Sequence, residues 1–170
     1  MSLIGQGSAA EYQVKAAFLF HFAQLVDWPP DAFGPAGQSI SLCLFDDEPE
    51  RQEFQETVEG KSLGDRTLHV RLLHDQQDLQ GCNILFLSLD EARRQHAVLS
   101  STQGQPVLTI GETDTFLKDG GMIRFHLEGD RVRFDINLPA SESSKLKISS
   151  RLLLLASQVL RGSAAGSGGR

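Results

Sequence analysis

The sequence has little of what nucleic-acid-binding and membrane-spanning proteins need. Its 16 lysines and arginines are outnumbered by 22 aspartates and glutamates, so the formal net charge is -6. This balance argues against a nucleic-acid surface, which would need a basic stripe to hold the phosphate backbone. The longest apolar stretch, residues 16–26, is interrupted by His21 and Gln24 and falls short of the roughly 18–20 residues of a membrane-spanning helix. We therefore expect neither nucleic-acid binding nor direct membrane insertion.

Signals for catalysis and metal binding are missing too. The five histidines show no paired spacing with each other or with the two cysteines, and no nucleophile stands beside a base in a known arrangement. We expect no metal, no cofactor and no enzymatic activity.

The length of 170 residues and a hydrophobic content of 40% suit one compact domain, which we place at residues 9–162. Small and polar residues near both ends predict flexible segments at 1–8 and 163–170. The start lacks a basic segment followed by an apolar run, so composition alone favours a cytoplasmic protein. A mature exported chain with a replaced start is the alternative.

Helical and strand patterns alternate through the first two thirds of the chain. This order predicts an α/β class, single-domain sandwich with a mixed, mostly parallel sheet of about six strands and helices on both faces. A C-terminal antiparallel hairpin follows. Helices are expected at residues 9–27, 49–58, 89–100 and 141–160, one helical turn at 113–118, and strands at 39–45, 67–73, 83–87 and 106–110.

The hairpin register can be derived from the sequence. A two-residue turn at Gly129-Asp130 pairs Phe125 with Phe134 on one face and Arg124 with Asp135 on the other. A slip of one residue would violate both faces, so the register is well determined.

A polar face follows from this register. Arg124, Asp135 and Asn137 lie on one side of the hairpin, and Lys147 and Ser149 follow at the start of the next expected helix. Such a face is most often solvated, but it would also serve as a protein contact or a small-ligand site. These five residues are our candidate partner-binding set.

Cys43 and Cys82 are the only cysteines. Cys43 falls inside the first expected core strand and Cys82 at the entry to the third, and a 2-1-3 strand order makes those strands neighbours. A disulfide between them is geometrically allowed. Two free, buried thiols are the alternative.

Asp46-Asp47 follows the first core strand, at the sheet edge where α/β proteins place ligand sites. This edge resembles the acidic pocket of a phospho-accepting receiver domain. However, no lysine ends the next core strand, as such a pocket requires. A cytoplasmic receiver-like or small-ligand-binding domain is therefore the alternative function.

Several blocks in fixed order resemble the YfiR family of small periplasmic proteins, and the likeness covers residues 12–162. The resemblance implies a periplasmic, non-enzymatic, typically homodimeric regulator that restrains an inner-membrane diguanylate cyclase, or another membrane sensor, by binding its periplasmic sensor region. The blocks lie at residues 14–23, Trp28-Pro29, Gly60-Lys61, and residues 81–86, 106–111, 120–125, 131–137 and 146–150.

The resemblance also bears on the state of the two cysteines and on the oligomeric state. Its oxidising compartment favours a disulfide between Cys43 and Cys82, which match a cysteine pair of the best-known member. This chain lacks that member's second pair, so redox control is not implied here. For the homodimer, we expect an interface on apolar surface of the first or last helix.

Overall fold

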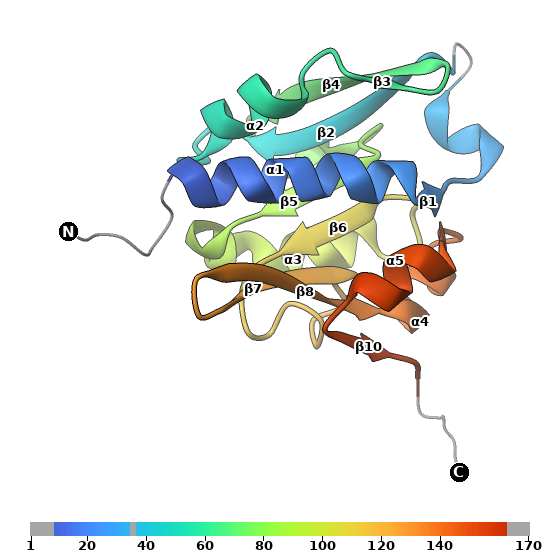
Figure 1. Cartoon of the computed structure of the whole chain (residues 1–170). Coiled ribbons are helices and arrows are strands. Elements are labelled where there is room, and N and C mark those ends of the chain that lie inside the picture. The colour runs from blue at the N-terminus through green and yellow to red at the C-terminus, as the bar shows by residue number, and fades with distance from the viewer. Residues whose placement is uncertain (1–8, 35–36, 163–170) are drawn as a thin grey trace.

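The computed structural model describes residues 9–34 and 37–162, and the expected flexible segments 1–8 and 163–170 lie outside this range. An eight-stranded sheet has the order β10-β8-β7-β6-β5-β2-β4-β3, and a two-stranded sheet pairs β1 with β9. Figure 1 shows α1 across one face of the large sheet and α3 on the other. The helices are α1 (Ala9–Gln24), α2 (Arg51–Val58), α3 (Ala92–Thr102), α4 (Leu138–Ser143) and α5 (Ser150–Leu155), with 3-10 turns at Pro30–Phe33, Gln76–Leu79 and Leu89–Glu91. The strands are β1 (Val26–Asp27), β2 (Ser39–Phe45), β3 (Ser62–Leu63), β4 (Arg66–Leu73), β5 (Ile84–Leu87), β6 (Leu108–Gly111), β7 (Ile123–Glu128), β8 (Arg131–Asn137), β9 (Lys147–Ile148) and β10 (Gln158–Leu160).

The large sheet is mixed and mostly parallel, which confirms the expected α/β sandwich. Strand β2 pairs in parallel with β4 and β5, β5 with β6, and β6 with β7. Antiparallel pairing is confined to the β7–β8 hairpin and to the edge pair β3–β4. The sheet has more strands than expected because its edge strands β3 and β10 have only 2 and 3 residues, too few to give a periodic pattern.

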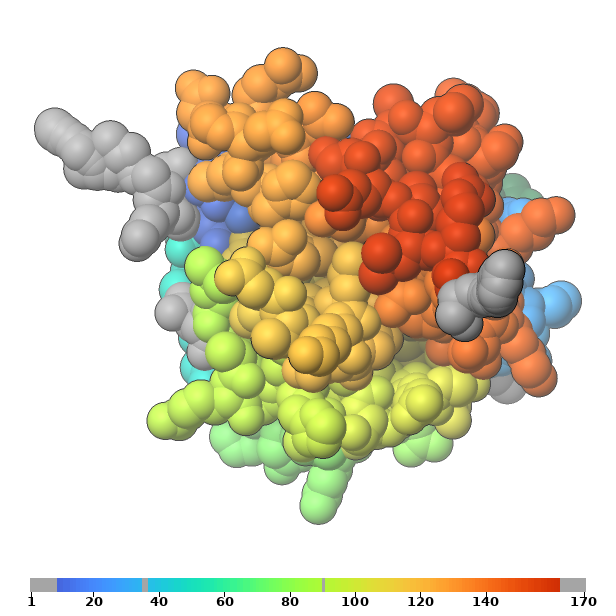
Figure 2. Space-filling model, turned by 90° about the horizontal axis from the view of Figure 1, so that it is seen from below, coloured from blue at the N-terminus to red at the C-terminus, as the bar shows by residue number. Residues whose placement is uncertain are grey.

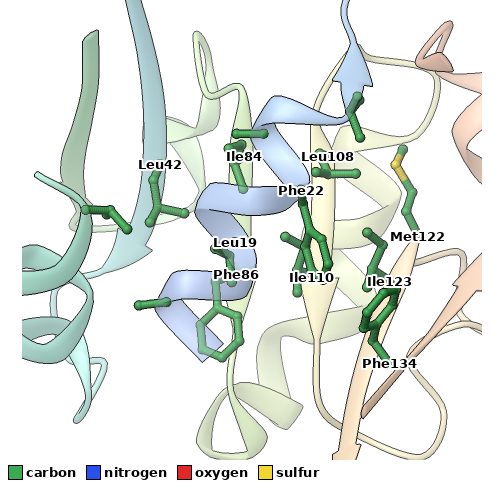
Figure 3. Packing of buried hydrophobic residues seen from close by; sticks show 14 of the residues in the cluster. Leu19, Phe22, Leu42, Ile84, Phe86, Leu108, Ile110, Met122, Ile123 and Phe134 are labelled. Carbon is green, nitrogen blue, oxygen red and sulfur yellow. The ribbon is translucent and has the colours of Figure 1, made fainter. Parts of the chain in front are cut away.

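Helix α1 is held on the middle of the sheet by its apolar side chains. Leu19 and Phe22 are almost fully buried, and Figure 3 shows them among Leu42, Phe86 and Ile110 from three neighbouring strands. Burying side chains of this size stabilises the fold by about 1.5–3 kcal/mol each. This contact sets the position of α1 relative to everything else on that face.

The disulfide lies in the core on the opposite face. Cys43 is inside β2, and Cys82 shortly precedes β5, the strand that neighbours β2. The two residues form a disulfide with their Cα atoms 6.0 Å apart. Both sulfur atoms belong to the buried cluster that also contains Val98 and Leu99 of α3, so the bridge ties two central strands together beneath that helix.

The hairpin has the register derived from the sequence. Phe125 pairs with Phe134, Arg124 with Asp135, and Glu128 with Arg131. The two phenylalanines face α1, where the ring centroid of Phe22 lies 4.9 Å from that of Phe134 and 5.8 Å from that of Phe125. Arg124 and Asp135 therefore lie on the side of the sheet away from α1.

The prediction of a single helix at residues 141–160 is wrong, because the structure has α4, β9, α5 and β10 there instead. Lys145 takes φ 64, which ends α4. Leu146 and Ile148 then alternate with Lys147, as in a strand, and Ile148 pairs with Val26. This pairing also ends α1 earlier than expected, since Val26–Asp27 becomes β1.

The helical turn expected at residues 113–118 is present as a series of hydrogen-bonded turns, in which the N–H of Asp119 donates to the carbonyl of Thr115, without a regular helix. Phe116 is fully buried at its centre. Its ring lies against Gly111 and Gly121, where an added Cβ would come within 2.3 Å and 2.1 Å of ring atoms. The two glycines therefore make room for the side chain that anchors this loop.

Replacing both cysteines, Cys43→Ala with Cys82→Ala, should lower the free energy of unfolding by about 4 kcal/mol in the chain-entropy model. The reason is that the bridge closes a loop with a sequence separation of 39. Urea titration of oxidised wild type and of the double variant measures the difference. Wild type treated with a reductant should unfold with the variant, and alkylation without reduction should leave both cysteines of the wild type unmodified. Equal stability of the oxidised wild type and the variant would contradict the prediction.

Candidate functional site

The Arg124–Asp135 pair forms an ionic cluster on the hairpin. Arg124 Nη1 lies 3.6 Å from Asp135 Oδ2, and Arg124 Nη2 lies 2.7 Å from Oδ1 of Asp114, whose side chain is 97% exposed. His126 Nε2 lies 3.2 Å from the other carboxylate oxygen of Asp135. Asp135 is thus buried between two partners within the chain, whereas Asp114 offers its carboxylate to solvent.

Asn137 has a structural function at the end of the same strand. Its Oδ1 accepts a hydrogen bond from the backbone N–H of Ala140 at 3.2 Å, which caps the start of α4. Its Nδ2 donates to the carbonyl of Leu117 at 3.1 Å. Both ends of the amide are therefore engaged inside the chain.

Lys147 and Ser149 do not lie beside the hairpin cluster. Lys147 is in β9, opposite Asp27 of β1, and its side chain is exposed. Ser149 Oγ accepts a hydrogen bond from the N–H of Arg151 at 3.1 Å and so caps α5. The five candidate residues therefore belong to two separate surfaces, one on the hairpin and one on the C-terminal segment.

A depression that the sequence did not predict surrounds Lys147. We call it the C-terminal hollow, and its cavity volume is about 420 Å³. Four of its side chains are apolar and three are charged. It is lined by Leu138, Glu142, Lys145, Leu146, Lys147, Ile148 and Leu153.

The Asp46-Asp47 edge is occupied by ion pairs. Asp46 Oδ2 lies 3.1 Å from Nδ1 of His74, and Asp47 Oδ2 lies 3.0 Å from Nη2 of Arg94. The hydrogen bond that His74 donates to the carboxylate of Asp46 raises the pKa of the imidazole above its usual range. Glu48, the next residue, is fully buried and accepts a hydrogen bond from the Ser88 hydroxyl at 2.7 Å. The carboxylates at this edge are thus engaged within the chain and do not form an open acidic pocket.

The same edge holds a buried ionic cluster that the sequence did not predict. Lys15 of α1 contacts Glu112, which follows β6, and lies 2.5 Å from Glu11. The Tyr12 hydroxyl and the backbone N–H of Leu89 each donate to Glu112 Oε1 at 2.9 Å. Burial raises the pKa of Tyr12, and the charge of Glu112 raises it further. The phenol therefore stays protonated and acts as a donor that fixes α1 to the sheet.

The described part of the chain has neither a metal-binding cluster nor a membrane-spanning helix. Residues 9–34 and 37–162 contain no group of three His, Cys, Asp or Glu side chains that would bind a metal ion. Within the same ranges, no helix combines the length and the apolar character required to span a membrane.

Comparison with known proteins gives a family and a fold. A family model described as YfiR/HmsC-like matches residues 12–157. A conserved domain protein from Vibrio cholerae O1 biovar El Tor strain N16961 is similar with a TM-score of 0.57 at 10% identity, over 86% of this chain and 59% of that chain. The ABC domain in complex with L-Trp from Streptococcus pneumoniae has a TM-score of 0.50 at 13% identity, over 76% of this chain and 58% of that chain. This chain therefore spans less than two thirds of either structure, and at these identities the likeness shows the fold alone.

Replacing Lys15 alone, by Lys15→Met, should destabilise the fold by about 3 kcal/mol, because it leaves the buried carboxylate of Glu112 without its cation. Adding Glu112→Gln should restore part of the loss, since the neutral amide oxygen still accepts from Tyr12 and Leu89. Urea titration of both single variants and the double variant gives the coupling energy. Additive losses would show that the pair does not act as a unit.

Proposed function

Because this chain belongs to the YfiR/HmsC-like family, we propose that it is a periplasmic regulatory binding protein that represses an inner-membrane diguanylate cyclase. It does so by binding the periplasmic sensor region of the cyclase, and so lowers cyclic-di-GMP. The family match over residues 12–157 is the observation that carries this proposal. The proteins of this family are regulators in cyclic-di-GMP signalling, and we propose that this chain likewise acts by binding and not by catalysis.

The disulfide supports the periplasmic location. Disulfides persist in oxidising compartments such as the bacterial periplasm and are rare in the cytosol. The bridge between Cys43 and Cys82 links β2 to the segment just before β5 and would be reduced if the protein worked in a reducing compartment. We therefore propose a periplasmic site of action.

We propose that two surfaces contribute to the contact with the membrane partner. The first is the hairpin face around Arg124, Asp135 and Asn137, where the exposed Asp114 extends the ionic cluster. The second is the C-terminal segment with Lys147 and Ser149. The two surfaces are separate, because Lys147 belongs to the β1–β9 sheet and not to the hairpin, so one partner would have to contact both.

The alternative, a cytoplasmic receiver-like or small-ligand domain, has less support. Its acidic residues Asp46 and Asp47 are paired with His74 and Arg94, and Glu112, not a lysine, follows β6. A phosphoryl group or a cation would have to displace these pairs before it could bind.

We also propose a homodimer, which should be visible by sedimentation velocity at micromolar concentrations. On α1, Val14 is 45% exposed and Phe18 and Phe20 are only partly buried, which is the apolar surface that a second copy would cover. Val14→Glu, which adds a charge without touching the core, should shift the protein towards monomer. A wild type that sediments only as monomer would contradict the prediction.

The regulatory function predicts a change in cells. Deleting the gene should raise the cellular level of cyclic-di-GMP, and reintroducing the wild-type gene should return it to its original level. The Asp114→Arg variant should restore repression only in part, because this substitution reverses an exposed charge beside Arg124 at little cost to the fold. The matched control is Asp65→Arg, the same change at an exposed turn near the opposite sheet edge, and it should restore repression fully. No rise on deletion would refute the function, and equal rescue by both variants would remove the hairpin from the contact.

A further inference from the structure

The C-terminal segment exposes more leucine than a solvated surface should. Leu154 is 85% exposed, Leu155 51% and Leu160 46%. Figure 2 shows this part of the chain, from orange-red to red, gathered in one area beside the hairpin. Three large exposed leucines within residues 154–160 indicate an interaction surface more than a solvated one.

The same segment carries positive charge in an acidic protein. Residues 138–162 contain four basic residues and one acidic residue, although the whole chain has a formal net charge of -6. Among the residues that the structure describes, Lys145, Lys147 and Arg151 form no ion pair. A partner can therefore engage these cations without first breaking an existing pair.

The C-terminal hollow lies within this surface. Leu138, Leu146, Ile148 and Leu153 are its apolar lining, and its charged lining is two lysines, Lys145 and Lys147, with one acid, Glu142. A concave apolar site rimmed by charge fits protruding apolar side chains of a segment with the opposite charge.

Lys145 is in a backbone conformation that a lysine rarely adopts. Its φ of 64 lies in the left-handed region, and it is the one non-glycine residue with positive φ among those described. The N–H of Leu146 donates to Ser141 and that of Lys145 to Glu142, which is the helix-ending motif in which glycine is usual at this position. A lysine here costs stability that a glycine would not, which indicates a use for its charge.

We propose that the C-terminal hollow and the exposed leucines of α5 bind an acidic, amphipathic segment of the membrane partner. Apolar side chains of that segment enter the hollow and cover Leu154, while its carboxylates pair with Lys145, Lys147 and Arg151. This inference rests on the proposed function, because it names the surface and the chemistry by which the partner is held.

Other occupants fit the surface less well. An anionic membrane would meet the basic charges and the protruding Leu154, but a flat lipid surface does not fill a hollow. A second copy of this chain would bring the same cations face to face, which is unfavourable. An acidic segment satisfies the charge, the hollow and the leucines together.

The first test uses complementation in the deletion strain with cyclic-di-GMP as the readout. Lys147→Glu and Leu154→Lys should lose most of the repression at normal protein levels. Their matched controls, Arg93→Glu on α3 and Leu89→Lys at another exposed leucine, should keep it. Lys145→Gly should lower repression while the melting temperature stays the same or rises, because the glycine relieves the backbone. Normal repression by Lys147→Glu and Leu154→Lys would overturn the proposal.

The second test needs no identified partner. The probe is a helical peptide with leucines on one face and glutamates on the other, and the control peptide has lysines in place of the glutamates. The Glu/Leu peptide should bind the wild type about tenfold more tightly than it binds Lys147→Glu, and added salt should weaken it. Equal binding of the two peptides would overturn the proposal.

The remaining outcomes identify a different occupant. Binding to phosphatidylglycerol vesicles that is lost in Leu154→Lys would assign the surface to a membrane, and a dimer that dissociates in Leu154→Lys would assign it to a second copy. Either result overturns the proposal. If deletion of the gene leaves cyclic-di-GMP unchanged, the proposed function fails, whereas the peptide comparison still decides what this surface binds.

Discussion

The contact between α1 and the β7–β8 hairpin determines where every surface of this protein faces. Phe22 packs against both Phe125 and Phe134, and strand geometry then forces their neighbours in sequence to the other side of the sheet. Arg124 and Asp135 face away from α1 for this reason, and Asp114 in the neighbouring loop forms an ion pair with Arg124. Helix α1 is fixed in turn at its start, where Lys15 and Tyr12 contact Glu112. One helix thus connects the carboxyl ends of the parallel strands to the hairpin.

The charges of the protein fall into two groups with different consequences for binding. At the carboxyl ends of the strands, Asp47 pairs with Arg94, Glu112 pairs with Lys15, and Asp46 is hydrogen-bonded to His74. A ligand there would replace an existing pair, so little free energy would be gained. The cations of the C-terminal segment have no such partner in the described part of the chain, and a new carboxylate would add an interaction without removing one. A negatively charged protein can therefore still bind an acidic partner through one local surface.

The sequence predicted those features that a short window determines. The hairpin register follows from Phe125, Phe134, Arg124 and Asp135 alone, because only one pairing satisfies both faces, and the central strands are long apolar runs. The buried pair of Lys15 and Glu112 could not be predicted in this way, since 97 residues separate the two and neither lies in a local motif. The edge strands were missed because two or three residues carry no period. Of the five candidate partner-binding residues, the sequence placed the three on the hairpin correctly on one face, but it could not show that Lys147 and Ser149 lie elsewhere.

The break in the expected last helix explains why that surface exists. An unbroken helix over residues 141–160 would have aligned its apolar side chains in one stripe and buried them on the sheet. Instead, the left-handed Lys145 and the cap at Ser149 divide the segment, and β9 pairs with β1 between the two short helices. Leu152 then enters the core, whereas Leu154 and Leu155 turn outward. Local preference favours a glycine at the break and a continuous helix around it, and the chain has neither. The break itself is explained by packing, since Leu146 and Ile148 are buried and Ile148 pairs with Val26. The lysine at position 145 brings no such gain where a glycine would serve, and departures of this kind are expected at functional sites.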